Sequence, residues 1–278
     1  MNRVEAFKSI AEQARRGELI FPTNVAASLK IQRAIDDPDC SLETASRLIL
    51  TEPLLAARVV SVANSVAYNR FGGAVANVRT AIPLLGFRTL HSIVAAIVVR
   101  QIAGTIIDPA LSAKAQKLWE HTAHVAALAH VIARRVGNVD PDTAMFAGVV
   151  HEVSGFYLLS RADHFPDLLD GELEEAAVAF EAPIGRAVLA KLMIPKAVAA
   201  AVESLWCGLR VMPPETLGDT LILANDLAEV ASPLDLRPAE TIRQDASEID
   251  CAIGDGTLAS ILEESAEEVR SLTAALLG

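Results

Sequence analysis

An all-α fold is predicted by the composition and the periodicity of this 278-residue sequence. Hydrophobic residues make up 52% of the chain and aromatic residues only 4%, a balance that suits packed helices better than the aromatic-rich strands of sandwiches and barrels. Apolar residues recur at helical spacing along nearly the whole chain, and no convincing strand alternation appears. Short segments rich in Pro, Gly and Asp separate the periodic stretches, so we expect about a dozen helices.

Proline and cap residues mark the expected helix starts towards the N-terminus. Pro22 can occupy the first turn of one helix, and Ser41 is a natural N-cap for the next. Pro53 opens a further helix from Leu54 to Asn64, which is apolar on nearly all sides apart from Arg58. We therefore expect that helix to be buried on most sides.

The middle of the chain predicts longer helices. A short helical turn over 78–85 should meet Gly86, and a long apolar helix follows that glycine. Beyond a boundary near 105–109, the segment 111–136 predicts one long helix, and Pro141 starts another.

Three more prolines and an amphipathic segment organise the second half. Further helix starts are expected at Pro183, Pro195 and Pro213. Residues 257–277 place apolar side chains on one stripe and acidic side chains opposite. We expect this C-terminal helix to pack on the protein itself, with docking on a second copy as the alternative.

Charge and hydropathy exclude several classes of function. The formal net charge is -11, with no basic stripe, so direct binding to nucleic acid is not expected. No uninterrupted apolar run reaches the roughly 18 residues of a membrane span, and the polar N-terminus lacks a signal peptide's apolar region. We therefore expect a cytoplasmic protein. Cys40, Cys207 and Cys251 fit neither a disulfide framework nor a metal knuckle.

Histidines and carboxylates supply the main candidate chemistry. His121 lies on the apolar stripe of its expected helix and should point into the core, whereas His130 lies on the opposite side and should be solvated. The pair His151–Glu152 falls on the next helix, and with His121 it could supply three ligands to a divalent metal. The only later histidine is His164. We therefore expect no bound metal, and these three residues as ligands if one binds.

Two long segments resemble a known family. FPTNVAASLKIQRAIDDPDCSLETASRLILTEPLLAARVVSVANS resembles the opening of HDOD domains, and VRTAIPLLGFRTLHSI is similar to the family's second block. The resemblance extends over residues 15–230. HDOD domains are helical bacterial relatives of the HD metal-dependent phosphohydrolases and are regarded mainly as non-enzymatic signalling modules. The resemblance thus implies an N-terminal helical bundle packed on an HD-like bundle.

Carried over residue by residue, the HD pattern implies a degenerate metal site with no catalytic residues. His121 matches the first ligand position and His151 the histidine of the His-Asp dyad, in which Glu152 replaces Asp. The final Asp position corresponds to Asn225 in ILANDLA. The intervening positions, where related sequences carry histidine, are Glu181, Leu205 and Trp206.

The resemblance also suggests a division of the chain. Its parts are an N-terminal HDOD subdomain (1–105), a degenerate HD-like subdomain (106–232) and a C-terminal helical extension (233–278). The interface of the two bundles is a natural cleft, and Arg58, Asn64, Ser65 and Glu181 are candidates to line it. The structural alternative has Arg58 paired with a carboxylate and Asn64–Ser65 capping a helix end.

Three classes of function remain, ranked in this order. The first is a non-catalytic module that relays a signal through contact with signalling proteins, and the second is a sensor of a nucleotide or cyclic dinucleotide. The third is a metal-dependent phosphohydrolase. No cofactor is expected, and a homodimer is compatible with the sequence.

Overall fold

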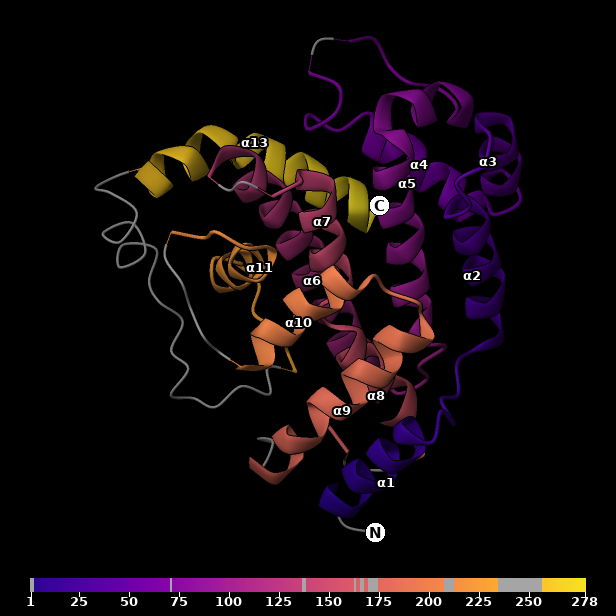
Figure 1. Cartoon of the computed structure of the whole chain (residues 1–278), viewed down its shortest axis with the longest axis vertical. Coiled ribbons are helices and arrows are strands. Elements are labelled where there is room, and N and C mark those ends of the chain that lie inside the picture. Colours follow the sequence, from indigo (N-terminus) through magenta and orange to yellow (C-terminus); the bar gives the residue numbers. More distant parts are fainter. Residues whose placement is uncertain are drawn as a thin grey trace.

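The computed structural model is all-helical, as the sequence predicts. It describes residues 3–70, 72–136, 139–162, 164–165, 168–169, 175–207, 213–234 and 257–278, and the regular structure of these residues consists of helices. The helices, labelled in Figure 1, are α1 (Arg3–Arg15), α2 (Thr23–Ile35), α3 (Leu42–Ile49), α4 (Pro53–Ala63), α5 (Val78–Ile102), α6 (Pro109–Arg135), α7 (Pro141–Val150), α8 (Val153–Ala162), α9 (Glu175–Lys191), α10 (Lys196–Cys207), α11 (Leu217–Asp226) and α13 (Thr257–Leu277).

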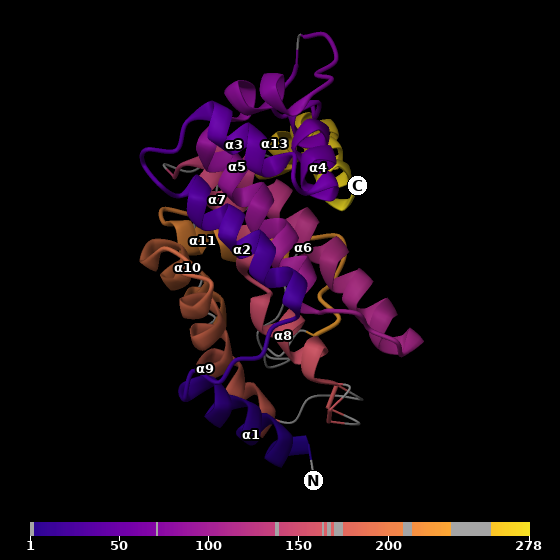
Figure 2. The same cartoon turned by 90° about the vertical axis from the view of Figure 1, so that its right-hand side faces the viewer.

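Helix α6 lies at the centre of the arrangement. It packs against α7, α11 and α13, while α5 packs against α2, α4 and α7. Helix α1 packs on α9, at the opposite end of the molecule from α13 (Figure 2). One continuous core cluster runs from Phe7 in α1 to Leu276 in α13. The division of the chain at 105 and 232 stays a prediction.

Local signals place most helix ends where the sequence predicts them. The side chain of Ser41 accepts a hydrogen bond from the backbone N–H of Thr44 and caps α3. Helix α5 contains one non-helical residue, Gly86, with φ 75° and ψ 167°. This positive φ favours glycine, and it kinks α5 at the expected position.

Three expectations about the helices are wrong. Pro183 lies inside α9 rather than at its start. The next residue, Ile184, is buried in the core, and this packing stabilises the helix in spite of the proline. Helix α11 begins after a capping box made by Thr216 rather than at Pro213. Helix α4 is not buried on most sides, since its packing partners leave one face open and Leu54 is 76% exposed.

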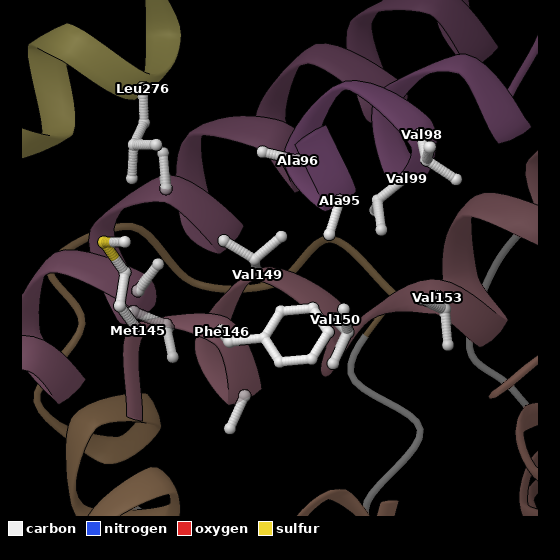
Figure 3. Packing of buried hydrophobic residues seen from close by; sticks show 14 of the residues in the cluster. Ala95, Ala96, Val98, Val99, Met145, Phe146, Val149, Val150, Val153 and Leu276 are labelled. Carbon is white, nitrogen blue, oxygen red and sulfur yellow. The ribbon is translucent and has the colours of Figure 1, made fainter. Parts of the chain in front are cut away.

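Small residues bring the central helices close together. In Figure 3, Ala95 and Val99 of α5 lie above Val149 and Val150 of α7 in a buried apolar layer. A methyl group placed on Gly148 would lie 2.5 Å from the backbone Cα of Ala126, so α6 and α7 pack closely only because residue 148 is glycine. This contact fixes the end of α7, where His151 follows.

Helix α5 is long and apolar enough to cross a membrane by length and composition alone. However, 67% of its most apolar window is buried by other helices. Polar residues such as Arg88 and His91 interrupt its apolar sequence, so the helix contains no uninterrupted apolar run long enough to span a membrane. In this fold α5 is a core helix.

Candidate functional site

Four side chains of the predicted degenerate site meet at one place. Nε2 of His121, on α6, lies 3.2 Å from Nε2 of His151 and 3.1 Å from Oδ1 of Asn225, on α11. Oε1 of Glu152 lies 3.8 Å from Nε2 of His121 and 4.0 Å from Nε2 of His151. Both histidines are buried, and Glu152 is partly exposed. We call these four residues the histidine cluster.

The junction between α7 and α8 positions two members of the cluster. Helix α7 ends at Val150 and α8 begins at Val153, so His151 and Glu152 form the turn between them rather than continuing a helix. A methyl group on Gly155 would lie 3.1 Å from Oε2 of Glu152. Glycine at that position therefore leaves room for the carboxylate beside the two rings.

Backbone carbonyls orient both imidazole rings. Nδ1 of His121 lies 2.7 Å from the carbonyl oxygen of Val230, and Nδ1 of His151 lies 2.6 Å from that of Gly148. A carbonyl oxygen only accepts hydrogen bonds, so each Nδ1 carries the proton. In the neutral rings each Nε2 is then left with a lone pair that faces the centre of the cluster. The centre thus gathers acceptor atoms suited to a cation.

The donor set fits a divalent metal in part. Two nitrogens bound to one metal at angles near 90–110° lie about 3.0–3.4 Å apart, and the two Nε2 atoms are 3.2 Å apart. The ligand atoms of His121, His151 and Glu152 all lie within 4.8 Å of one another. Hydrogen bonds from Nδ1 to carbonyls are also typical of metal-binding histidines. These three residues would hold the ion, and Glu152 would have to move inwards.

The other positions of the HD pattern are used for packing. Leu205 is buried in the core. The ring of Trp206 lies against Gly185, where an added methyl group would come within 2.5 Å, and Arg186 lies over its face at 5.8 Å. Glu181 is partly buried on α9 and does not belong to the group of converging ligand atoms.

The remaining candidate cleft residues stabilise helix ends. Arg58 donates to carbonyl oxygens of the last turn of α13, including that of Ala275 at 2.9 Å. Among the described residues Arg58 forms no ion pair with an Asp or Glu side chain, and backbone oxygens at the end of α13, that of Gly278 at 3.4 Å among them, take its hydrogen bonds instead. Asn64 donates to the carbonyl oxygens of Val60 and Val75, and Ser65 donates to that of Val62. Capping by Asn64 and Ser65 is confirmed.

His130 is not solvated as expected. It is 5% exposed, and its ring lies 5.6 Å from that of Tyr68, whose hydroxyl donates to Asp142 at 2.8 Å. Burial lowers the pKa of His130, against the opposing charge of Asp142. The spacing on α6 did not reveal this burial because α6 is covered on several sides.

Glu268 is a second residue that helix periodicity misplaced. It belongs to the expected polar face of the C-terminal helix, yet it is 3% exposed. Its Oε2 accepts hydrogen bonds from Arg70 at 2.7 Å and from Arg134. Burial would raise the pKa of Glu268, but the two arginines outweigh it and lower the pKa.

Solved structures share this fold. A candidate metal-dependent phosphohydrolase from Shewanella amazonensis SB2B aligns with a TM-score of 0.75 and 20% identity, covering 99% of this chain and 100% of its own. An HDOD domain protein of unknown function from Geobacter sulfurreducens aligns with a TM-score of 0.64 and 20% identity, covering 98% and 99%. A candidate signal transduction protein from Marinobacter aquaeolei VT8 aligns with a TM-score of 0.63 and 15% identity, covering 99% and 66%.

The family comparison is more specific than these likenesses of fold. A search of curated proteins found no match. The family model of the HDOD domain matches residues 21–204, which include both segments that carry the resemblance and the residues His121, His151 and Glu152. Because this match covers more than half of the chain, the chain belongs to the HDOD domain family.

Proposed function

We propose that this chain is a non-catalytic signal transduction module that works by binding rather than by turnover. The observation that carries the proposal is the composition of the histidine cluster. Two histidines and one carboxylate converge, while Asn225 supplies a neutral oxygen and Leu205 and Trp206 supply no ligand. The name of the Marinobacter relative agrees with a role in signalling.

Hydrolysis of a phosphoester requires more metal ligands than the histidine cluster supplies. The reaction needs a metal that holds a water, lowers its pKa and stabilises the charge of the transition state. Among the described residues, Glu152 is the only carboxylate in the group of converging ligand atoms, and it lies farther from both Nε2 atoms than a bound ligand would. A weakly held ion would lack the fixed geometry that activates water.

In a binding module the same residues have a structural role. His121 joins α6 to the segment after α11 through Val230, and His151 closes the end of α7. The cluster therefore links the consecutive helices α6 and α7 to α11, which is distant from them in sequence. We place the module in the cytoplasm, with signalling proteins as its partners.

Metal content and turnover test the proposal together. The full chain would be loaded with Mn²⁺ or Zn²⁺, analysed by mass spectrometry for bound metal, and assayed with bis(4-nitrophenyl) phosphate, nucleotides and cyclic dinucleotides. The matched variants are His151→Ala in the cluster and His164→Ala, which replaces an exposed histidine outside it. We expect no turnover above that of His151→Ala. Metal-dependent turnover that His164→Ala keeps and His151→Ala loses would establish a phosphohydrolase instead.

A further inference from the structure

A hollow lies beside the histidine cluster and shares no residue with it. Its volume is about 490 Å³, and its walls are α6, α13 and the segment 227–230 that follows α11. Sites for small molecules commonly measure about 300–1,000 Å³ and have largely apolar walls. Here Leu128 of α6 and Leu262 and Val269 of α13 supply the apolar surface. We call this hollow the α6–α13 cavity.

A few polar groups interrupt the apolar wall. The hydroxyl oxygen of Thr273 is buried and has no hydrogen-bond partner within the described part of the chain. Nδ1 of His124 accepts the backbone N–H of Glu229 at 3.3 Å, so the neutral ring keeps its proton on Nε2. Burial lowers the pKa of His124, which favours this neutral form. A bound molecule would therefore meet a neutral imidazole on this side of the cavity.

The charges around the cavity decide between classes of ligand. Glu120 and Glu229 contribute two carboxylates and Arg270 one guanidinium. Phosphate recognition uses several convergent cations, so a nucleotide or cyclic dinucleotide does not suit this cavity. A carboxylate or sulfonate would meet the same net negative charge. An uncharged molecule avoids that repulsion and can still use the apolar wall.

We propose that the α6–α13 cavity is a binding site for a small uncharged amphiphile, with an apolar ring or chain and one N–H or O–H group. The apolar part would lie against Leu128 and Val269, and the N–H or O–H group would donate to the carboxylate of Glu120 or Glu229. This inference goes beyond the proposed function, because binding in the cavity does not depend on whether the histidine cluster turns over a substrate.

The wall of the cavity connects it to the histidine cluster. Val230 lines the cavity, and its carbonyl oxygen accepts the Nδ1 proton of His121 at 2.7 Å. The backbone N–H of Glu229, one residue earlier, bonds to His124. A ligand that displaces this segment changes the hydrogen bonds of both histidines. Binding in the cavity can thus alter the hydrogen bonds of His121 and His124 on α6 through residues 229 and 230.

A pair of fluorescent probes with the same ring system provides the test. N-phenyl-1-naphthylamine is uncharged and has one N–H group, whereas 8-anilino-1-naphthalenesulfonate adds a negative charge to the same frame. With the full chain we expect saturable, one-to-one binding of the neutral probe with a dissociation constant on the order of 1–100 µM. Binding of the sulfonate should be at least about tenfold weaker.

Two matched variants locate the bound probe. Ala274 and Ala57 are both exposed helical alanines, but Ala274 lines the α6–α13 cavity and Ala57 lines a shallow hollow on α4. Ala274→Trp should weaken binding of the neutral probe at least about tenfold, and Ala57→Trp should leave it unchanged. If Ala274→Trp does not fold by circular dichroism, Ala266→Leu fills the same cavity. Equal binding by the filled variant and the wild type, equal binding of both probes, or emission that never saturates would overturn the proposal.

Discussion

Replacing Gly148 by alanine tests how closely α6 and α7 must pack to form the histidine cluster. The added methyl group would lie 2.5 Å from the Cα and 2.9 Å from the backbone N of Ala126. Non-bonded carbon atoms rest about 3.5–4.0 Å apart, so the two helices must separate by about 1 Å or more. Both contacts are with backbone atoms, which no rotamer change can move away.

The expected cost follows from these contacts. Overpacking a core typically costs about 1–3 kcal/mol, and a clash with backbone belongs at the upper end of that range. Alanine gains up to about 1 kcal/mol over glycine in helix propensity. We therefore expect Gly148→Ala to lower the free energy of unfolding by about 2 kcal/mol, which corresponds to a fall in Tm of about 4–8 °C for a chain of this size.

Urea unfolding and thermal melting followed by circular dichroism measure this loss. Gly73→Ala is the matched control, because a methyl group there meets nothing within 4 Å, and it should change stability by no more than about 0.5 kcal/mol. The carbonyl of Gly148 also accepts the Nδ1 proton of His151, so the ring signals of His151 should move in NMR spectra. An unfolding midpoint for Gly148→Ala equal to that of the wild type would refute the reasoning.

Three further predictions concern charge. Glu268→Gln removes the buried carboxylate between two arginines and should lower the free energy of unfolding in urea by about 2 kcal/mol. Because the pKa of Glu268 is lowered in the folded state, the difference between variant and wild type should be present above pH about 4.3 and shrink as the pH falls through the folded-state pKa. A difference that persists in acid would contradict the pairing. Asn225→Asp adds a charge beside His121 and should tighten Zn²⁺ binding by at least about tenfold in calorimetry; unchanged affinity would place residue 225 outside the coordination sphere. Burial lowers the pKa of His91, His124 and His130 in the folded protein. Below the pKa of about 6.5 that histidine has in the unfolded chain, the unfolded chain therefore binds more protons, and the free energy of unfolding should decline as the pH falls. Equal urea midpoints at pH 7.5 and 5.5 would argue against this.

Features that depend on a few neighbouring residues could be predicted from the sequence. The cap at Ser41 and the kink at Gly86 follow from side-chain and backbone preferences over one turn of chain. The inward direction of His121 follows from the apolar stripe it shares, and this holds because α6 is central. The set of His121, His151 and Glu152 could be predicted from residue types and helix placement, Asn225 comes from the family resemblance, and the convergence of the four residues required the folded chain.

Features that depend on which helix covers which could not be predicted in this way. Pro183 reads as a helix start because local preference disfavours proline in a helix interior, whereas α9 continues through it. His130 and Glu268 lie on faces that periodicity assigns to solvent. His130 is buried against Tyr68 and Asp142, and Glu268 of α13 is buried between Arg70 and Arg134. The local sequence of α6 or α13 does not show which residues will cover these side chains.

The buried position of Glu268 is related to the α6–α13 cavity through the way in which α13 is attached. Helix α13 is held on the core by polar anchors as well as by its apolar stripe: Arg58 caps its last turn, and Arg70 and Arg134 bind Glu268. Polar anchors fix the position of a helix without requiring its whole inner face to fill the space below. A helix attached in this way can leave about 490 Å³ open beside it. The buried carboxylate of Glu268 on α13 and the hollow next to the histidine cluster are both consistent with this mode of attachment.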